Sequence, residues 1–201
     1  MIKNIIFDVG RVLIDWNPYL LYREVFQNDQ EIDAFFEKID FYAWNLSMDK
    51  GLSFAQGVAA KQEMFPEYSK EIERFNSGWE RTVSGQLDEP VEVLKKLKKA
   101  NYPVYALTNF SAEKFALTLS RFDFFKNFDG IVVSAEEKTV KPEAKIFEIL
   151  CSRYNLKPEE SLFIDDSEVN IEGAKKLGFK TILFKYPDLL EPQIKSFGIK
   201  I

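Results

Sequence analysis

Polar side chains follow short apolar runs at several points of the sequence. Asp8 ends the run Ile5–Phe7, Thr108–Asn109 ends a second run, and Asp165–Asp166 ends a third. Carboxylates that lie close together raise one another's pKa unless a cation lies among them. A set of oxygen ligands suits Mg²⁺, and Lys141 and Thr108 offer a positive charge and a donor to an anion. This combination predicts phosphoryl transfer, in which an Asp can be the nucleophile.

The composition narrows the chemistry further. The 201 residues contain no His and one Cys, so His-based acid–base catalysis, His metal sites and internal disulfides are excluded. The net charge of −5 gives no support for a nucleic-acid partner. No apolar run reaches membrane-spanning length, and Asp8 and Arg11 interrupt the one near the start. We therefore expect no membrane partner and a cytoplasmic location.

The segments that hold the polar residues alternate between strand and helix patterns. Strands are expected at 5–7, 103–107, 130–134, 161–165 and 181–184. Helices are expected at 91–100, 112–122, 142–154 and 169–177. Such alternation is typical of an α/β fold with a parallel sheet. The carboxyl ends of parallel strands meet at one edge, which would bring the polar residues together.

Residues 16–87 have a different pattern. Apolar residues recur there at helical spacing, Ser53 is a plausible N-cap, and no good strand is apparent. The first strand also has no crossover helix directly after it. We therefore predict an α/β core of residues 1–15 and 88–201, with residues 16–87 inserted as an all-α cap.

Four motifs resemble those of the haloacid dehalogenase (HAD) superfamily. They are Phe7–Leu13, Leu107–Asn109, Lys141–Glu143 and Phe163–Ser167, in this order along the whole chain. The resemblance implies a Rossmann-like HAD core with a C1-type helical cap formed by residues 16–87.

The resemblance also implies roles for individual residues. Asp8 would be the nucleophile, and Thr108 and Lys141 would bind the transferred phosphoryl group. Mg²⁺ would be held by four residues, namely Asp8, Asp165, Asp166 and the Gly10 carbonyl, with Asn170 behind them. We further expect three residues to contact the substrate, namely Asn109, Arg11 and Trp44.

One position departs from the family pattern. Most phosphatases of this superfamily carry a general acid two residues after the nucleophile, where this chain has Gly10. A bacterial subgroup that includes a glucose-1-phosphate phosphatase is similar in having Asp-x-Gly here. Without a general acid, we expect the rate to depend steeply on the leaving group. A shallow dependence would mean that Asp15 or a cap residue donates the proton.

Three functions compete. The leading one is a Mg²⁺-dependent phosphatase of a small phosphorylated metabolite, with sugar phosphates such as hexose 1-phosphates as candidates. A 2-haloacid dehalogenase would need no metal, and the pair Asp165–Asp166 disfavours it. A relic that binds phosphate without turnover is the third. Four cap aromatics are candidates for stacking on a sugar or for simple packing: Trp16, Tyr42, Trp44 and Trp79. The sequence does not indicate an oligomeric state.

Overall fold

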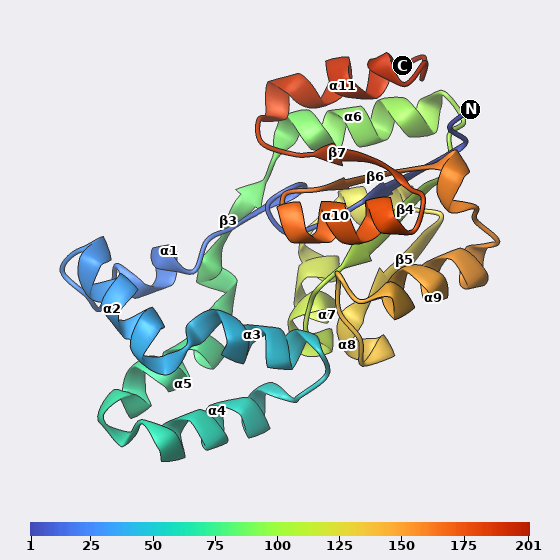
Figure 1. The fold of residues 1–201 in the computed structure, drawn as a ribbon. Helices are drawn as coiled ribbons and strands as arrows, with labels where there is room; N and C mark the ends of the chain where they lie inside the picture. Colours follow the sequence, from blue (N-terminus) through green and yellow to red (C-terminus); the bar gives the residue numbers. More distant parts are fainter.

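A five-stranded parallel sheet forms the centre of the molecule (Figure 1), as seen in a computed structural model that describes all residues 1–201. The strand order is β5-β4-β1-β6-β7. The strands are β1 (Asn4–Phe7), β4 (Val104–Thr108), β5 (Gly130–Val133), β6 (Ser161–Asp165) and β7 (Lys180–Leu183). In the central strand, Phe7 pairs with Ala106 on one side and with Ile164 on the other. The predicted α/β fold with a parallel sheet is confirmed.

Helices cover both faces of this sheet. They are α6 (Asp88–Lys99), α7 (Ala112–Arg121), α8 (Ser134–Glu137), α9 (Ala144–Tyr154), α10 (Glu168–Lys176) and α11 (Leu190–Ser196). Successive strand residues point to opposite faces. Ile5 and Phe7 therefore pack in the cluster that includes α6 and α11, and Ile6 packs in the cluster that includes α9 and α10. Figure 1 shows α6 and α11 together on one side of the sheet and α9 on the other.

Five further helices lie together beside the sheet and are called the cap helices below (Figure 1). They are α1 (Tyr19–Tyr22), α2 (Asp29–Ile39), α3 (Phe41–Asp49), α4 (Phe54–Met64) and α5 (Ser69–Ser77). Their core is aromatic. The Phe41 ring stacks on Phe36 with 4.1 Å between the ring centroids and lies edge-on to Phe75 with 4.8 Å between the centroids. Ser53 caps α4 as predicted, because its hydroxyl accepts a hydrogen bond from the Gln56 backbone N–H.

Short 3₁₀ helices complete the chain: η1 (Pro66–Tyr68), η2 (Trp79–Thr82), η3 (Asp123–Asn127), η4 (Pro158–Glu160) and η5 (Pro187–Leu189). None of the helices combines the length and the apolar character that crossing a bilayer requires.

Two short strands correct the expectation that residues 16–87 hold no strand. β2 (Ile14–Trp16) and β3 (Val83–Gln86) form an antiparallel ribbon that connects the cap helices to the sheet. Both strands have only three or four residues, and neither is buried along its whole length. Their sequences therefore carry no strand pattern, and pairing across the fold is what holds them extended.

Two helix boundaries also differ from the expectation. The helix expected from residue 142 begins at Ala144, and Pro142 precedes it in a loop after a cis peptide bond. The helical spacing of apolar residues expected after residue 16 is also interrupted, since α1 ends at Tyr22 and Val25 is exposed. The stop of α10 before Gly178 is as predicted, since Gly178 has a φ of +94°.

Three polar contacts attach one end of the cap to the carboxyl edge of the sheet. The Ser134 hydroxyl donates to the Asp49 backbone carbonyl. The Lys50 ammonium pairs with Glu143 at 2.6 Å, and the Phe54 backbone N–H donates to the Glu113 carboxylate at 3.1 Å. The cap therefore rests on the loops that follow β4 and β5, directly above the edge where the motif residues lie.

Candidate active site

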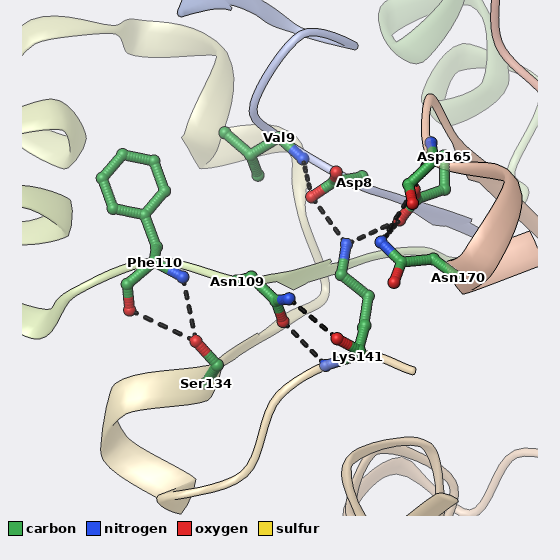
Figure 2. Close-up of polar contacts among 9 residues, drawn as sticks. Asp8, Val9, Asn109, Phe110, Ser134, Lys141, Asp165 and Asn170 are labelled. Atoms are coloured by element: carbon green, nitrogen blue, oxygen red, sulfur yellow. Dashed lines mark hydrogen bonds and ion pairs between the residues drawn. The ribbon is translucent and has the colours of Figure 1, made fainter. Parts of the chain in front are cut away.

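Asp8 lies at the carboxyl end of the central strand, directly after the buried Phe7 (Figure 2). Its Oδ1 accepts a hydrogen bond from the Val9 backbone N–H at 2.7 Å and pairs with Lys141 Nζ at 2.8 Å. The carboxylate is 10% exposed. Because both contacts are made by Oδ1, Oδ2 is the oxygen left for a ligand or an electrophile.

Lys141 lies between two carboxylates and is fully buried. Its Nζ is 2.8 Å from Asp8 and 2.7 Å from Asp165. The Asn109 side chain holds the lysine backbone from both sides, accepting from its N–H at 2.8 Å and donating to its carbonyl at 3.0 Å (Figure 2). The predicted substrate contact of Asn109 is thus accompanied by a positioning role, since its amide links the end of β4 to Lys141.

The two carboxylates after β6 have different environments. Asp165 is buried, and its oxygens accept hydrogen bonds from the Ser167 backbone N–H and from Asn170 Nδ2, besides the contact with Lys141. Asp166 is 27% exposed, and Arg11 approaches it at 4.0 Å. Asp166 therefore has the freer oxygens, whereas Asp165 also orients Lys141.

The three carboxylates form a group of the size that holds a metal ion. One oxygen each of Asp8, Asp165 and Asp166 lies within 4.8 Å of the others. Hard oxygen ligands of this kind suit Mg²⁺. Lys141 is the one buried cation among three acids, so the donor set carries excess negative charge that a divalent cation would neutralise. The three carboxylates predicted as metal ligands thus lie together and fit Mg²⁺.

The same excess of charge shifts the pKa values. Burial, together with Asp165 and Asp166, raises the pKa of Asp8 to about 7, although Lys141 opposes this. Burial and Asp165 likewise raise the pKa of Asp166. Burial by itself lowers the pKa of Lys141, but Asp165 and Asp8 outweigh it and raise that pKa. A bound cation would return the two carboxyls to their ionised form.

Thr108 carries an unpaired hydroxyl. It is the last residue of β4 and is fully buried, and its Oγ1 is the one buried side-chain polar atom without a hydrogen-bond partner. An unsatisfied buried hydroxyl costs about 1–3 kcal/mol. An anion at the predicted phosphoryl position would satisfy it.

A small cavity separates this site from the cap. Eight residues line it: Gly10, Trp16, Asn45, Asp49, Trp79, Asn109, Phe110 and Ser111. A Cβ added at Gly10 would meet nothing within 4 Å, and the positive φ of this loop belongs to Arg11 at 59°. Neither the backbone conformation nor a lack of space therefore requires glycine at position 10, and this residue lines the cavity.

Two predicted substrate residues lie elsewhere. Trp44 is packed in the cap core, and its indole N–H donates to the Gly57 carbonyl at 3.0 Å. It does not line the cavity, so its predicted substrate contact has no support in this geometry. The exposed Arg11 lies over the Trp16 ring, with its Cζ 5.3 Å from the ring centroid. It also lies beside Asp166, the most exposed of the three carboxylates.

The sequence analysis missed two polar residues of the cavity. Asn45 and Asp49 are one turn apart on α3, and neither was predicted as a site residue. The i, i+4 spacing of an amide and a carboxylate was the available signal. It is common on exposed helices, and only packing of the cap shows which polar face meets the site.

The predicted function classes include a dehalogenase and a phosphatase, and relatives of both kinds are found. The chain is 30% identical to (S)-2-haloacid dehalogenase 4A of Burkholderia cepacia over 47% of its own length, and the match spans only 41% of that protein. It is 26% identical to a phosphorylated carbohydrates phosphatase of Thermotoga maritima, over 90% of this chain and 83% of the relative.

A solved structure covers nearly the whole chain. It is a HAD family enzyme of Bacteroides thetaiotaomicron in complex with magnesium and inorganic phosphate. It is 26% identical, covers 92% of this chain and 95% of its own, and has a TM-score of 0.73. The family model for haloacid dehalogenase-like hydrolases matches residues 5–184. With its sheet, its motif residues and this match in agreement, the chain belongs to the haloacid dehalogenase-like hydrolase family.

Proposed function

We propose that this protein is a Mg²⁺-dependent phosphatase of small phosphate monoesters that reacts through an aspartyl-phosphate on Asp8. The observation that carries the proposal is the group of three carboxylates, Asp8, Asp165 and Asp166, beside the buried Lys141. A haloalkane carbon needs no divalent cation to accept a carboxylate, whereas a dianionic phosphate does need its charge neutralised. A third carboxylate would only add repulsion to dehalogenation.

Each residue then has a defined task. Asp8 Oδ2 attacks phosphorus, and the bond between phosphorus and the leaving oxygen breaks. Lys141 and the Thr108 hydroxyl bind the phosphoryl oxygens. Water then attacks phosphorus, the bond to Asp8 breaks, and inorganic phosphate is released.

The metal-binding residues would be the side chains of Asp8, Asp166 and Asp165 and the Gly10 carbonyl. When bound there, Mg²⁺ supplies charge neutralisation for the attacking carboxylate and the phosphoryl oxygens. Asn170 and Ser167 keep Asp165 oriented toward Lys141. Asn109 fixes the Lys141 backbone, which keeps the ammonium group between the two acids.

The comparisons support the phosphatase over the dehalogenase. One relative that matches most of the chain is a phosphorylated carbohydrates phosphatase, and one solved neighbour is in complex with magnesium and inorganic phosphate. The dehalogenase match covers less than half of either chain. A sugar phosphate would place its ring in the cavity lined by Trp16 and Trp79. We therefore propose a small phosphorylated metabolite of the cytoplasm as the substrate.

The test is the variant Asp8→Asn. An amide cannot form the aspartyl-phosphate, so hydrolysis of 4-nitrophenyl phosphate should fall to background while the melting temperature changes little. Excess EDTA should abolish the wild-type activity, and Mg²⁺ should restore it. Chloride release from 2-chloropropionate in EDTA would instead establish the dehalogenase. Phosphate binding without hydrolysis of any ester would establish a relic.

A further inference from the structure

The cap places one carboxylic acid beside the position where the core lacks one. Asp49 is the last residue of α3 and lines the cavity next to Gly10, as does Asn45 one turn earlier. Asn45 Nδ2 donates to Asp49 Oδ2 at 2.9 Å. Asn109, Phe110 and Ser111, which follow the phosphoryl-binding Thr108, also line this cavity. A leaving group that departs from phosphorus therefore moves into a cavity with Asp49 in its wall.

The backbone of Asp49 is attached to the core. The Ser134 hydroxyl, which donates to the Asp49 carbonyl, also accepts a hydrogen bond from the Phe110 backbone N–H at 2.9 Å (Figure 2). The next residue, Lys50, forms the ion pair with Glu143 two positions after Lys141. Because these contacts join α3 to the loops of the site, Asp49 keeps a fixed place over it when the cap is docked.

We propose that Asp49 is the general acid of the reaction and donates its proton to the leaving-group oxygen from the cap. This inference rests on the proposed phosphatase function. As Asp8 Oδ2 bonds to phosphorus, the electron pair of the breaking bond passes to the leaving oxygen, which takes the Asp49 proton and departs as an alcohol. In the second step the attacking water gives a proton to the Asp49 carboxylate, and inorganic phosphate is released. The acid is thereby regenerated.

The surroundings of Asp49 support this role. Burial raises the pKa of its carboxyl to about 7, against the hydrogen bond from the Ser111 backbone; Asp8 adds to the rise, and Lys141 and Asn45 oppose it. A general acid works best with a pKa near the pH of the reaction. Asp8 and Lys141 are the two charged groups that act on the Asp49 carboxyl.

Asp15 was the other candidate for this role. Its half-buried carboxylate accepts a hydrogen bond from the Ser84 hydroxyl across the β2–β3 ribbon. It does not line the cavity beside Gly10. Asp15 therefore serves as a matched control, because Asp15→Asn makes the same substitution at a carboxylate that does not line the cavity.

The experiment measures kcat/KM for aryl and alkyl phosphates against the pKa of the leaving group. Wild type and Asp15→Asn should show a shallow slope, in place of the steep one expected from the sequence for a protein without a general acid. Asp49→Asn should lose about 10²- to 10⁴-fold with alkyl esters but less than about tenfold with 4-nitrophenyl phosphate, whose leaving group departs without a proton. Asp49→Asn combined with Gly10→Asp should regain alkyl hydrolysis, because position 10 has room for a side chain.

Other outcomes overturn the proposal. An equal loss for all esters in Asp49→Asn would show a structural role, and no loss would show no role. If Asp49→Asn does not fold, the slopes of wild type and Asp15→Asn still test the proposal. A steep slope in the wild type overturns the assignment of Asp49 as the general acid. A shallow wild-type slope that becomes steep in Asp15→Asn overturns it as well. If wild type fails to hydrolyse even 4-nitrophenyl phosphate, the proposed phosphatase function itself fails, whatever Asp49 does.

Discussion

At the scale of single residues, the site is organised around one buried lysine. Lys141 touches the proposed nucleophile Asp8 and the metal-site residue Asp165 at nearly equal distances. Removing Lys141 would leave two buried carboxylates without their cation, so this lysine is required for stability as well as chemistry. Thr108 is the opposite case, because its hydroxyl has no structural partner to lose.

This contrast predicts different effects for two buried threonines. Thr108→Val should leave stability unchanged or raise it, because an unsatisfied hydroxyl is removed. It should weaken phosphate binding by about 10- to 100-fold, as expected for a lost hydrogen bond to a charged ligand. Calorimetric titration with inorganic phosphate in Mg²⁺ and thermal melts measure the two effects.

Thr118→Val is the matched control. The Thr118 hydroxyl donates to the Lys114 carbonyl within α7, at 2.9 Å and buried. This variant should leave phosphate affinity unchanged. If Thr108→Val lowered the melting temperature and left phosphate affinity intact, the hydroxyl would be a structural group and the proposed anion position would be wrong.

At the scale of elements, the cap helices and the ribbon decide what surrounds the leaving group. Trp16 belongs to β2 and Trp79 to η2, so both lie where the cap joins the core. The Trp79 ring also packs on Phe110, with 5.5 Å between the ring centroids, and this contact connects the cap to the loop after β4. Trp44 does not line the cavity and packs in the core of the cap.

Two tryptophan variants separate these roles. Trp16→Phe should change the ratio of kcat/KM between sugar and aryl phosphates by about 2- to 10-fold, the range of an aromatic contact. Trp44→Phe should leave that ratio unchanged. It should cost about 1 kcal/mol through the lost hydrogen bond to Gly57, a drop of about 2–4 °C in Tm. A selectivity change confined to Trp44→Phe would place the substrate deeper in the cap than proposed.

At the scale of the whole molecule, the raised pKa values connect metal binding to stability. Without a cation, folding holds protons on Asp8 and Asp49 up to a pH of about 7, whereas their unfolded pKa values are near the ordinary 3.8. The folded state thus binds more protons between these values. The free energy of unfolding of the metal-free protein should therefore fall as the pH rises through that range.

Mg²⁺ should reverse this loss. It competes with protons for Asp8 and Asp166, so it should raise the melting temperature more at about pH 8 than at about pH 5. At one hundred times its Kd, a bound ligand adds about 2.7 kcal/mol to the free energy of unfolding. Differential scanning calorimetry with Mg²⁺ or EDTA at both pH values measures this. Asp166→Ala should lose most of the gain, and Asp15→Asn should keep it. An equal gain at both pH values would mean that Mg²⁺ binds outside this group.

The sequence by itself determined the core and the side chains that follow its strands. Continuous apolar runs indicate buried strands, and parallel strands have all their carboxyl ends at one edge. Asp8, Thr108 and Asp165–Asp166 therefore had to converge on one edge, whatever the detailed packing, and the motif at Lys141 joined them. The same kind of local pattern correctly predicted that Ser53 caps α4 and that α10 ends before Gly178.

Only the tertiary structure decided what faces the site from the cap. The β2–β3 ribbon needs partners such as Asp15 and Ser84, which are 69 residues apart, and Asp49 meets Ser134 across 85 residues. Trp16 lines the cavity, whereas Trp44 packs inside the cap. This difference likewise depends on tertiary packing, which the periodicity of the sequence does not encode. Local patterns determine which face of an element is buried; which distant element covers that face is decided by the free energy of the whole packed chain.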